Sequence, residues 1–113
     1  AKILVTEDNE SPEVHIEKPK EGYLHIFDKA LLPVGKTLII GRITVVVNAT
    51  DESGIDRVEF YIDDKLKTTD EESPYEWQWN EFAIGNHEIE VVAYDNSGNK
   101  AEDRMNVLIF NWM

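Results

Sequence analysis

The sequence predicts an all-β fold in which two antiparallel sheets pack face to face. Residues 43–50 and 87–95 carry this prediction, because apolar and polar residues alternate along each stretch, as in a strand with one buried face. Each stretch ends in a D-x-S-G turn, at residues 51–54 and 95–98, made of residue types that favour turns. We therefore expect these two strands to supply the two inner faces of one sandwich.

Length and composition fit a single module. The chain has 113 residues, no cysteine, and 23 acidic against 11 basic residues, which gives a formal net charge of −12. One domain is expected from this length, with residues 1–11 as a linker or a disordered N-terminus and residues 12–113 as the folded part. The negative charge disfavours nucleic acid and anionic membranes as partners, and no apolar run is long enough for a membrane span.

The first third of the chain is the least regular. Val14 and Ile16 alternate with polar neighbours and predict a short edge strand. Residues 23–27 can form another strand, whereas Pro33 argues against a central strand around it. Residues 37–40 are apolar and β-branched, so the whole stretch 23–41 is expected to cover one edge or end of the sandwich.

The later strands follow at turn-bounded intervals, for a total of about seven. Residues 65–69 predict a polar edge strand, and residues 101–110 predict a last strand with Leu108, Phe110 and Trp112 facing outward. No amphipathic helix is indicated, so a parallel sheet with crossover helices is not expected. The predicted core consists of Val45, Val47, Val58, Phe60, Ile62, Ile89, Val91 and Ala93.

Several segments together resemble the prokaryotic Ig-like domains of bacterial and archaeal proteins. They are residues 55–64, Ser-Pro-Tyr-Glu-Trp at 73–77, Gly-Asn-His at 85–87 and Ala-Tyr-Asp-Asn-Ser-Gly-Asn at 93–99. The resemblance covers residues 12–110. It implies an Ig-like or fibronectin type III-like sandwich, an extracellular or cell-surface location, and a non-catalytic role in spacing, adhesion or domain support.

An Ig-like strand order would place the two D-x-S-G turns at the same end of the sandwich. Asp51, Asp56, Asp95 and Asn99 could then converge, and calcium prefers such oxygen ligands. We name these four residues as candidate calcium ligands and otherwise expect no cofactor. The alternative is that they serve only as turn residues.

A second candidate site is the aromatic stripe of Tyr75, Trp77 and Trp79, which share one strand face. The stripe could stack against sugar rings, but core packing, with Trp77 between the sheets, is the interpretation we favour. Asn9 and Asn48 each begin an N-x-[ST] sequon that could accept a glycan on a secreted protein.

Catalytic patterns are missing from the sequence. The three histidines are scattered, and neither a zinc-binding H-E-x-x-H nor a nucleophilic G-x-S-x-G motif occurs. We expect a non-enzymatic, monomeric module whose partners are neighbouring domains of its parent protein or cell-surface components, without membrane insertion. The alternatives are a carbohydrate-binding module and an accessory domain packed on a secreted hydrolase. A patch formed by Leu108, Phe110 and Trp112 would favour the accessory domain.

Overall fold

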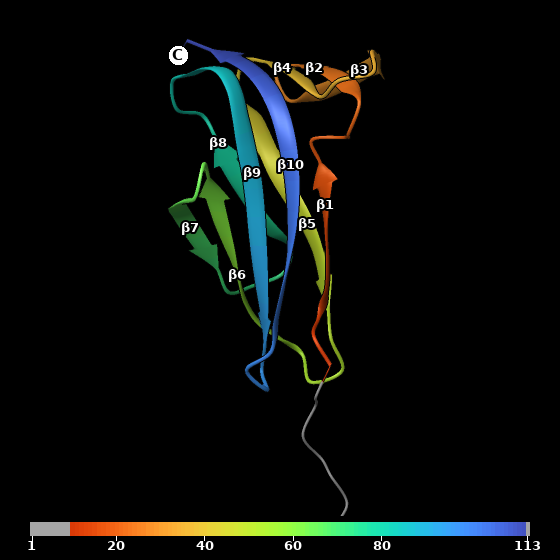
Figure 1. Cartoon of the computed structure of the whole chain (residues 1–113), viewed down its shortest axis with the longest axis vertical. Helices are drawn as coiled ribbons and strands as arrows, with labels where there is room; N and C mark the ends of the chain where they lie inside the picture. Colours follow the sequence, from red (N-terminus) through yellow and green to blue (C-terminus); the bar gives the residue numbers. More distant parts are fainter. Residues whose placement is uncertain (1–9, 113) are drawn as a thin grey trace, which may run out of the picture.

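The computed structural model describes residues 10–112, which form ten strands and no helix (Figure 1). The predicted linker, residues 1–11, lies largely outside the described residues. The strands are β1 (Glu13–Lys18), β2 (Tyr23–Ile26), β3 (Lys29–Pro33), β4 (Leu38–Ile40), β5 (Ile43–Thr50), β6 (Ile55–Ile62), β7 (Lys65–Asp70), β8 (Tyr75–Trp79), β9 (Ala83–Asp95) and β10 (Lys100–Asn111). They form two facing sheets, so the predicted sandwich is confirmed.

The smaller sheet has the order β1-β5-β8, and all its pairs are antiparallel. The larger sheet has the order β3-β2-β4-β10-β9-β6-β7. Its spine is the pair β9–β10, which stays in register from Lys100 opposite Tyr94 to Asn111 opposite Ala83. This uninterrupted pair runs along the sandwich from one end to the other (Figure 1).

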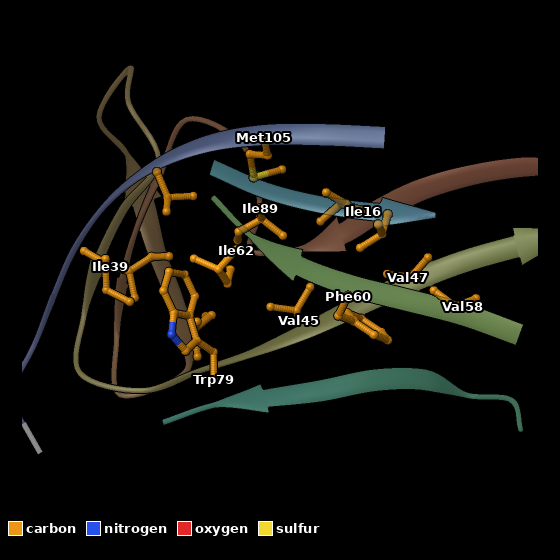
Figure 2. Close-up of a cluster of buried hydrophobic side chains, with 14 of the residues drawn as sticks. Ile16, Ile39, Val45, Val47, Val58, Phe60, Ile62, Trp79, Ile89 and Met105 are labelled. Atoms are coloured by element: carbon orange, nitrogen blue, oxygen red, sulfur yellow. The ribbon is translucent and has the colours of Figure 1, made fainter. Parts of the chain in front are cut away.

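The core lies between the sheets, as the alternating residues of β5, β6 and β9 predict. All eight predicted core side chains are buried, with at most 6% of their surface exposed. Figure 2 shows Val45 and Val47 of β5 facing Phe60 and Ile62 of β6, with Trp79 closing the layer beside Ile39. Burial of this apolar surface stabilises the fold by about 25 cal/mol per Å².

The sequence prediction of about seven antiparallel strands is wrong in two details. Residues 23–40 form three strands, β2, β3 and β4, and β4 runs parallel to both β2 and β10. Parallel neighbours need a crossover connection. Here β3 with its loops supplies that crossover, so no helix is required.

Candidate functional site

The two ends of the sandwich differ in chemistry. We call the end that carries the two D-x-S-G turns the turn pole, and the end that carries β2, β3 and β4 the apolar pole (Figure 1). Glu10 lies at the turn pole, where its carbonyl oxygen accepts a hydrogen bond from Asn99 Nδ2 at 3.1 Å. Trp112 follows the last residue of β10, at the apolar pole. The described chain therefore enters the sandwich at one pole and leaves it at the other.

Two rows of apolar side chains cross the outer face of the large sheet at the apolar pole. The inward side chains His25, Ile39 and Ile109 are fully buried, and their strand neighbours point to the opposite face. Strand register aligns these neighbours into two rungs across the sheet. One rung is Leu32, Leu24, Leu38 and Leu108, and the other is Ile26, Ile40, Phe110 and Ile84.

Exposed hydrophobic side chains concentrate at this pole. Of the eight large hydrophobic residues that are most exposed in residues 10–112, all except Leu66 lie here. Phe82 is the most exposed, at 70%. The other six are Phe27, Leu31, Leu32, Val34, Ile84 and Trp112. Scattered surface hydrophobics need no explanation, but a contiguous patch marks an interaction surface.

Buried polar contacts hold the apolar pole in place. His25 Nε2 accepts a hydrogen bond from the backbone N–H of Lys20 at 2.9 Å. Asp28 accepts two hydrogen bonds from Thr44, from its backbone N–H and its hydroxyl, both at 2.7 Å. Lys18 pairs with Asp28 at 2.9 Å. These contacts attach the β2–β3 hairpin to β1 and β5, so the exposed apolar side chains stand on an anchored unit.

The same contacts shift two pKa values at this pole. Burial of the His25 ring lowers the pKa of His25, although hydrogen bonds to the backbone of Leu38 and Tyr23 partly oppose the shift. Burial alone would raise the pKa of Asp28, but the hydrogen bonds from Lys18 and Thr44 outweigh it, and the pKa lies below its ordinary value. His25 is thus favoured as the neutral ring and Asp28 as the carboxylate.

Charge is distributed unevenly between this region and the rest of the chain. Residues 18–42 hold five of the 11 basic residues and only two of the 23 acidic ones. Lys29, Lys36 and Arg42 are exposed. The apolar pole is therefore edged by positive charge on a molecule that is otherwise strongly acidic.

At the turn pole the two D-x-S-G turns lie side by side, as predicted. Asn96 of the second turn donates to the first turn twice, from its backbone N–H to Gly54 O at 3.0 Å and from Nδ2 to Ser53 O at 2.7 Å. Gly54 has φ +88°, and a Cβ there would lie 2.7 Å from Asn96 Nδ2. Glycine is therefore required both by the backbone and by the neighbouring turn.

The four predicted calcium ligands are placed at or near this pole, but each is engaged in its own contacts. Asp51 accepts hydrogen bonds from the N–H and hydroxyl of Ser53. Asp95, 3% exposed, accepts the backbone N–H groups of Ser97 and Asn99 and the side-chain amide of Asn99. Asp56 pairs with Arg57 at 2.7 Å.

Within residues 10–112, no three His, Cys, Asp or Glu side chains are grouped so that they could hold a metal ion. Calcium binding stays a prediction, and it would require these oxygens to exchange turn hydrogen bonds for the ion.

A charged strip covers the outer face of the large sheet between the poles. Arg104 bridges Glu88, Glu90 and Glu102 at 3.0–3.1 Å. Burial raises the pKa of Glu90, while Arg104 opposes the shift. The hydrogen bond from Tyr61 to Glu59 raises the pKa of the tyrosine to about 12. This network is not evident in the sequence, because the pairing of β9 with β10 creates it.

The aromatic stripe of β8 lies mainly in the core. Trp79 is 1% exposed, while Trp77 is half-buried, stacks on Trp79 with ring centroids 6.0 Å apart, and contacts Phe60. Trp77 packs against the core from the same strand face, as predicted, but Trp79 is the more completely enclosed of the two. A stripe buried in this way cannot serve as a flat platform for sugar rings.

The sequon residue Asn48 is exposed on β5. Asn9 lies outside the described residues. No helix in residues 10–112 is long and apolar enough to cross a membrane.

The two facing sheets and the absence of helix in residues 10–112 define the class of β-sandwich domains. A family model described as the bacterial Ig domain matches residues 31–91, more than half of the chain. The chain belongs to this family, as the sequence resemblance predicted. No curated protein matches the chain.

Solved structures show the same fold. The chain is 25% identical to fibronectin(III)-like modules of Clostridium thermocellum CbhA, with a TM-score of 0.67, and the match covers 89% of this chain and 100% of that chain. It is 15% identical to Bacteroides ovatus SGBP-B from a mixed-linkage glucan utilization locus, solved with a heptasaccharide. There the TM-score is 0.57, and the match covers 94% of this chain but 26% of that one.

A lytic polysaccharide monooxygenase of Jonesia denitrificans is 16% identical, with a TM-score of 0.53. That match covers 65% of this chain and 56% of that chain. The Bacteroides ovatus and Jonesia denitrificans structures show the fold alone, because their identity to this chain is low.

Proposed function

We propose that this chain is a non-catalytic module of a larger extracellular or cell-surface protein, placed in series between neighbouring domains that it spaces and supports. The observation that carries the proposal is the apolar pole. Its two apolar rungs lie where the chain leaves the sandwich, with Leu32 and Ile84 exposed at their ends and the side chains between them half-buried. A following domain packed there would bury this surface and fix its own orientation.

The spine of the larger sheet supports the same role. Strands β9 and β10 have 13 and 12 residues, and they pair along their length between the poles. Both poles are therefore connected by one continuous hydrogen-bonded ladder. The bacterial Ig family and the fibronectin(III)-like neighbour also favour a modular role, since such domains commonly occur in extracellular or surface proteins.

Two kinds of neighbouring domain fit this proposal, a further module and a secreted hydrolase. Leu108 and Phe110 face outward in adjacent rungs, with Trp112 just beyond them and 56% exposed. This arrangement fits the expectation stated for an accessory domain. The carbohydrate-binding alternative loses its aromatic stripe, because Trp79 is buried.

Hydrogen exchange on the parent polypeptide tests this proposal. The exchange of β4 and of the last residues of β10 is compared between the module alone and the module joined to its following domain. We expect slower exchange there in the longer protein and unchanged exchange at residues 51–54 of the turn pole.

Leu108→Lys should remove the added protection, while Leu66→Lys, an exposed site on the edge strand β7, should retain it. Equal exchange in both proteins would contradict the proposal.

A further inference from the structure

We propose that the apolar pole binds residues 1–9 of a second copy of this chain, so that copies associate head to tail. This inference rests on the in-series role proposed above. It goes further by naming the occupant of the apolar pole.

The sequence of this segment complements the pole. Residues 1–9 are Ala-Lys-Ile-Leu-Val-Thr-Glu-Asp-Asn, in which three consecutive apolar residues are followed by two carboxylates. The pole offers exposed apolar side chains on β3, including Leu31 and Leu32, beside the exposed Lys29 and Lys36. Apolar residues can thus meet apolar residues while the carboxylates meet lysines, which favours both affinity and a fixed direction.

The segment cannot reach the apolar pole of its own molecule. Glu10 is held beside Asn99 at the turn pole, whereas the pole lies at the level of Leu108 and Phe110 in β10. Along β10, eight or more residues separate Asn99 from Leu108, which corresponds to about 30 Å at the rise of a β-strand. Residues 3–5 lie at most about 25 Å from Glu10 even in a fully extended chain. The occupant must therefore come from another copy.

Strand β3 is suited to receive an extended segment. It is one of the two edge strands of the larger sheet, and all five of its residues are exposed. An open edge can accept an added strand through its main chain. Pro33 has no N–H and interrupts any such ladder, so apolar side-chain contacts would carry much of the binding.

Other occupants fit less well. Two apolar poles packed against each other would bring two positively charged edges together, because residues 18–42 are basic in both copies. A head-to-tail contact instead places the basic pole of one copy beside Glu7 and Asp8 of the next. This inference departs from the expectation that the isolated chain is a monomer.

Sedimentation velocity of the full chain from micromolar to millimolar concentration tests the inference. Wild-type chain should form dimers and longer open assemblies, as a head-to-tail contact that does not close must. Leu4→Asp disables the segment, and Leu32→Asp disables the pole. Each variant alone should associate at least about tenfold more weakly, equivalent to about 1.4 kcal/mol.

The decisive result is complementation. An equimolar mixture of the two variants should form a one-to-one dimer and nothing larger, because one variant keeps a working segment and the other keeps a working pole. Leu66→Asp, at an exposed site away from the pole, should associate like wild type. If circular dichroism shows that Leu32→Asp is unfolded, Val34→Asp replaces it as the pole variant.

Three outcomes would overturn the inference. A wild-type chain that stays monomeric at millimolar concentration would do so, and it would leave the proposed in-series role untouched. Self-association of Leu4→Asp at wild-type strength would indicate a pole-to-pole contact instead. A mixture of the two folded variants without heterodimer would exclude the segment as the occupant.

Discussion

The two poles of this sandwich differ in how the side chains at the ends of the strands are satisfied. At the turn pole, polar side chains accept the backbone N–H groups of their own turns, and Asn96 ties one turn to the other. At the apolar pole, the buried contacts of His25 and Asp28 hold a surface whose outer side chains have no comparable partners in residues 10–112. The first pole is complete within the chain, whereas the second has the composition of an interface.

This difference predicts how each pole responds to substitution, beginning with the core that supports the apolar pole. Trp79→Ala should have the largest effect, a loss of about 3–5 kcal/mol in the free energy of unfolding, because the ring is enclosed beside Ile39 of β4 (Figure 2). Trp77→Ala should cost less, since that ring is half-buried. Chemical denaturation measures both, and equal losses would contradict the assignment of Trp79 as the enclosed tryptophan.

At the turn pole, Asp95→Ala should cost roughly 2–3 kcal/mol, because it removes the buried carboxylate that accepts the backbone N–H groups of Ser97 and Asn99. Asp56→Ala is the matched control at the same pole. Its carboxylate makes an exposed pair with Arg57, and such pairs contribute little. Thermal unfolding compares them, and a small loss for Asp95→Ala would show that the turn pole is not held by its own carboxylates.

Acid should loosen the apolar pole first. Since the folded state lowers the pKa of His25 below 6.5, the unfolded chain binds more protons as the pH falls below that value, and stability decreases. A second loss should follow below about pH 3.8, when Asp28, whose pKa is also lowered, becomes protonated.

Unfolding measured from pH 7 to pH 5 should show a weaker decline in His25→Gln than in wild type. His15→Gln is the control, because that side chain is 74% exposed. An identical decline in wild type and His25→Gln would contradict the role of the buried ring.

The predicted calcium site provides a further test of how the turn pole is stabilised. If calcium binds there, the metal-stripped chain should melt at a higher temperature in millimolar calcium than in a calcium-free salt of equal ionic strength. Asn99→Ala should abolish the rise if this residue is a ligand. An unchanged melting temperature would assign Asp51, Asp56, Asp95 and Asn99 to turn formation alone.

The buried faces of β5, β6 and β9 could be predicted from the sequence, because the alternation of apolar and polar residues lies within each strand. Alternation within β5, β6 and β9 identifies the core side chains, and the repeated D-x-S-G pattern identifies two turns that do meet. The outward direction of Leu108, Phe110 and Trp112 could be predicted, but the two apolar rungs could not, because they depend on which strands become neighbours. The three-residue strand β4 is too short to show a period, and its pairing with β10 joins residues about 70 positions apart.

A partial signal for the apolar pole was present in the sequence. Leu24 and Ile26 flank His25, and Leu38 and Ile40 flank Ile39, so both strands repeat an apolar outer face around one inward residue. Only their register shows that the two faces are continuous. The alternation in residues 87–95 places Glu90 on the polar face of its strand, yet Glu90 is only 8% exposed and pairs with Arg104 of the neighbouring strand.

The smallest effect is expected at the apolar pole itself. Ile84→Gln should change the stability of the isolated module by no more than about 0.5 kcal/mol, because the side chain is 48% exposed and its polar replacement stays in water. Thermal unfolding of the isolated module measures this, and a loss comparable to that of Asp95→Ala would show that the outer rungs belong to the core.

The most direct test of the account measures the same Ile84→Gln substitution in two contexts, the isolated module and the parent polypeptide with its following domain. The account predicts a near-neutral change in the module alone and a loss of roughly 1 kcal/mol or more in the longer protein, where the side chain would be buried. Leu66→Gln should be neutral in both. If Ile84→Gln is neutral in both contexts as well, the apolar pole is not a domain interface.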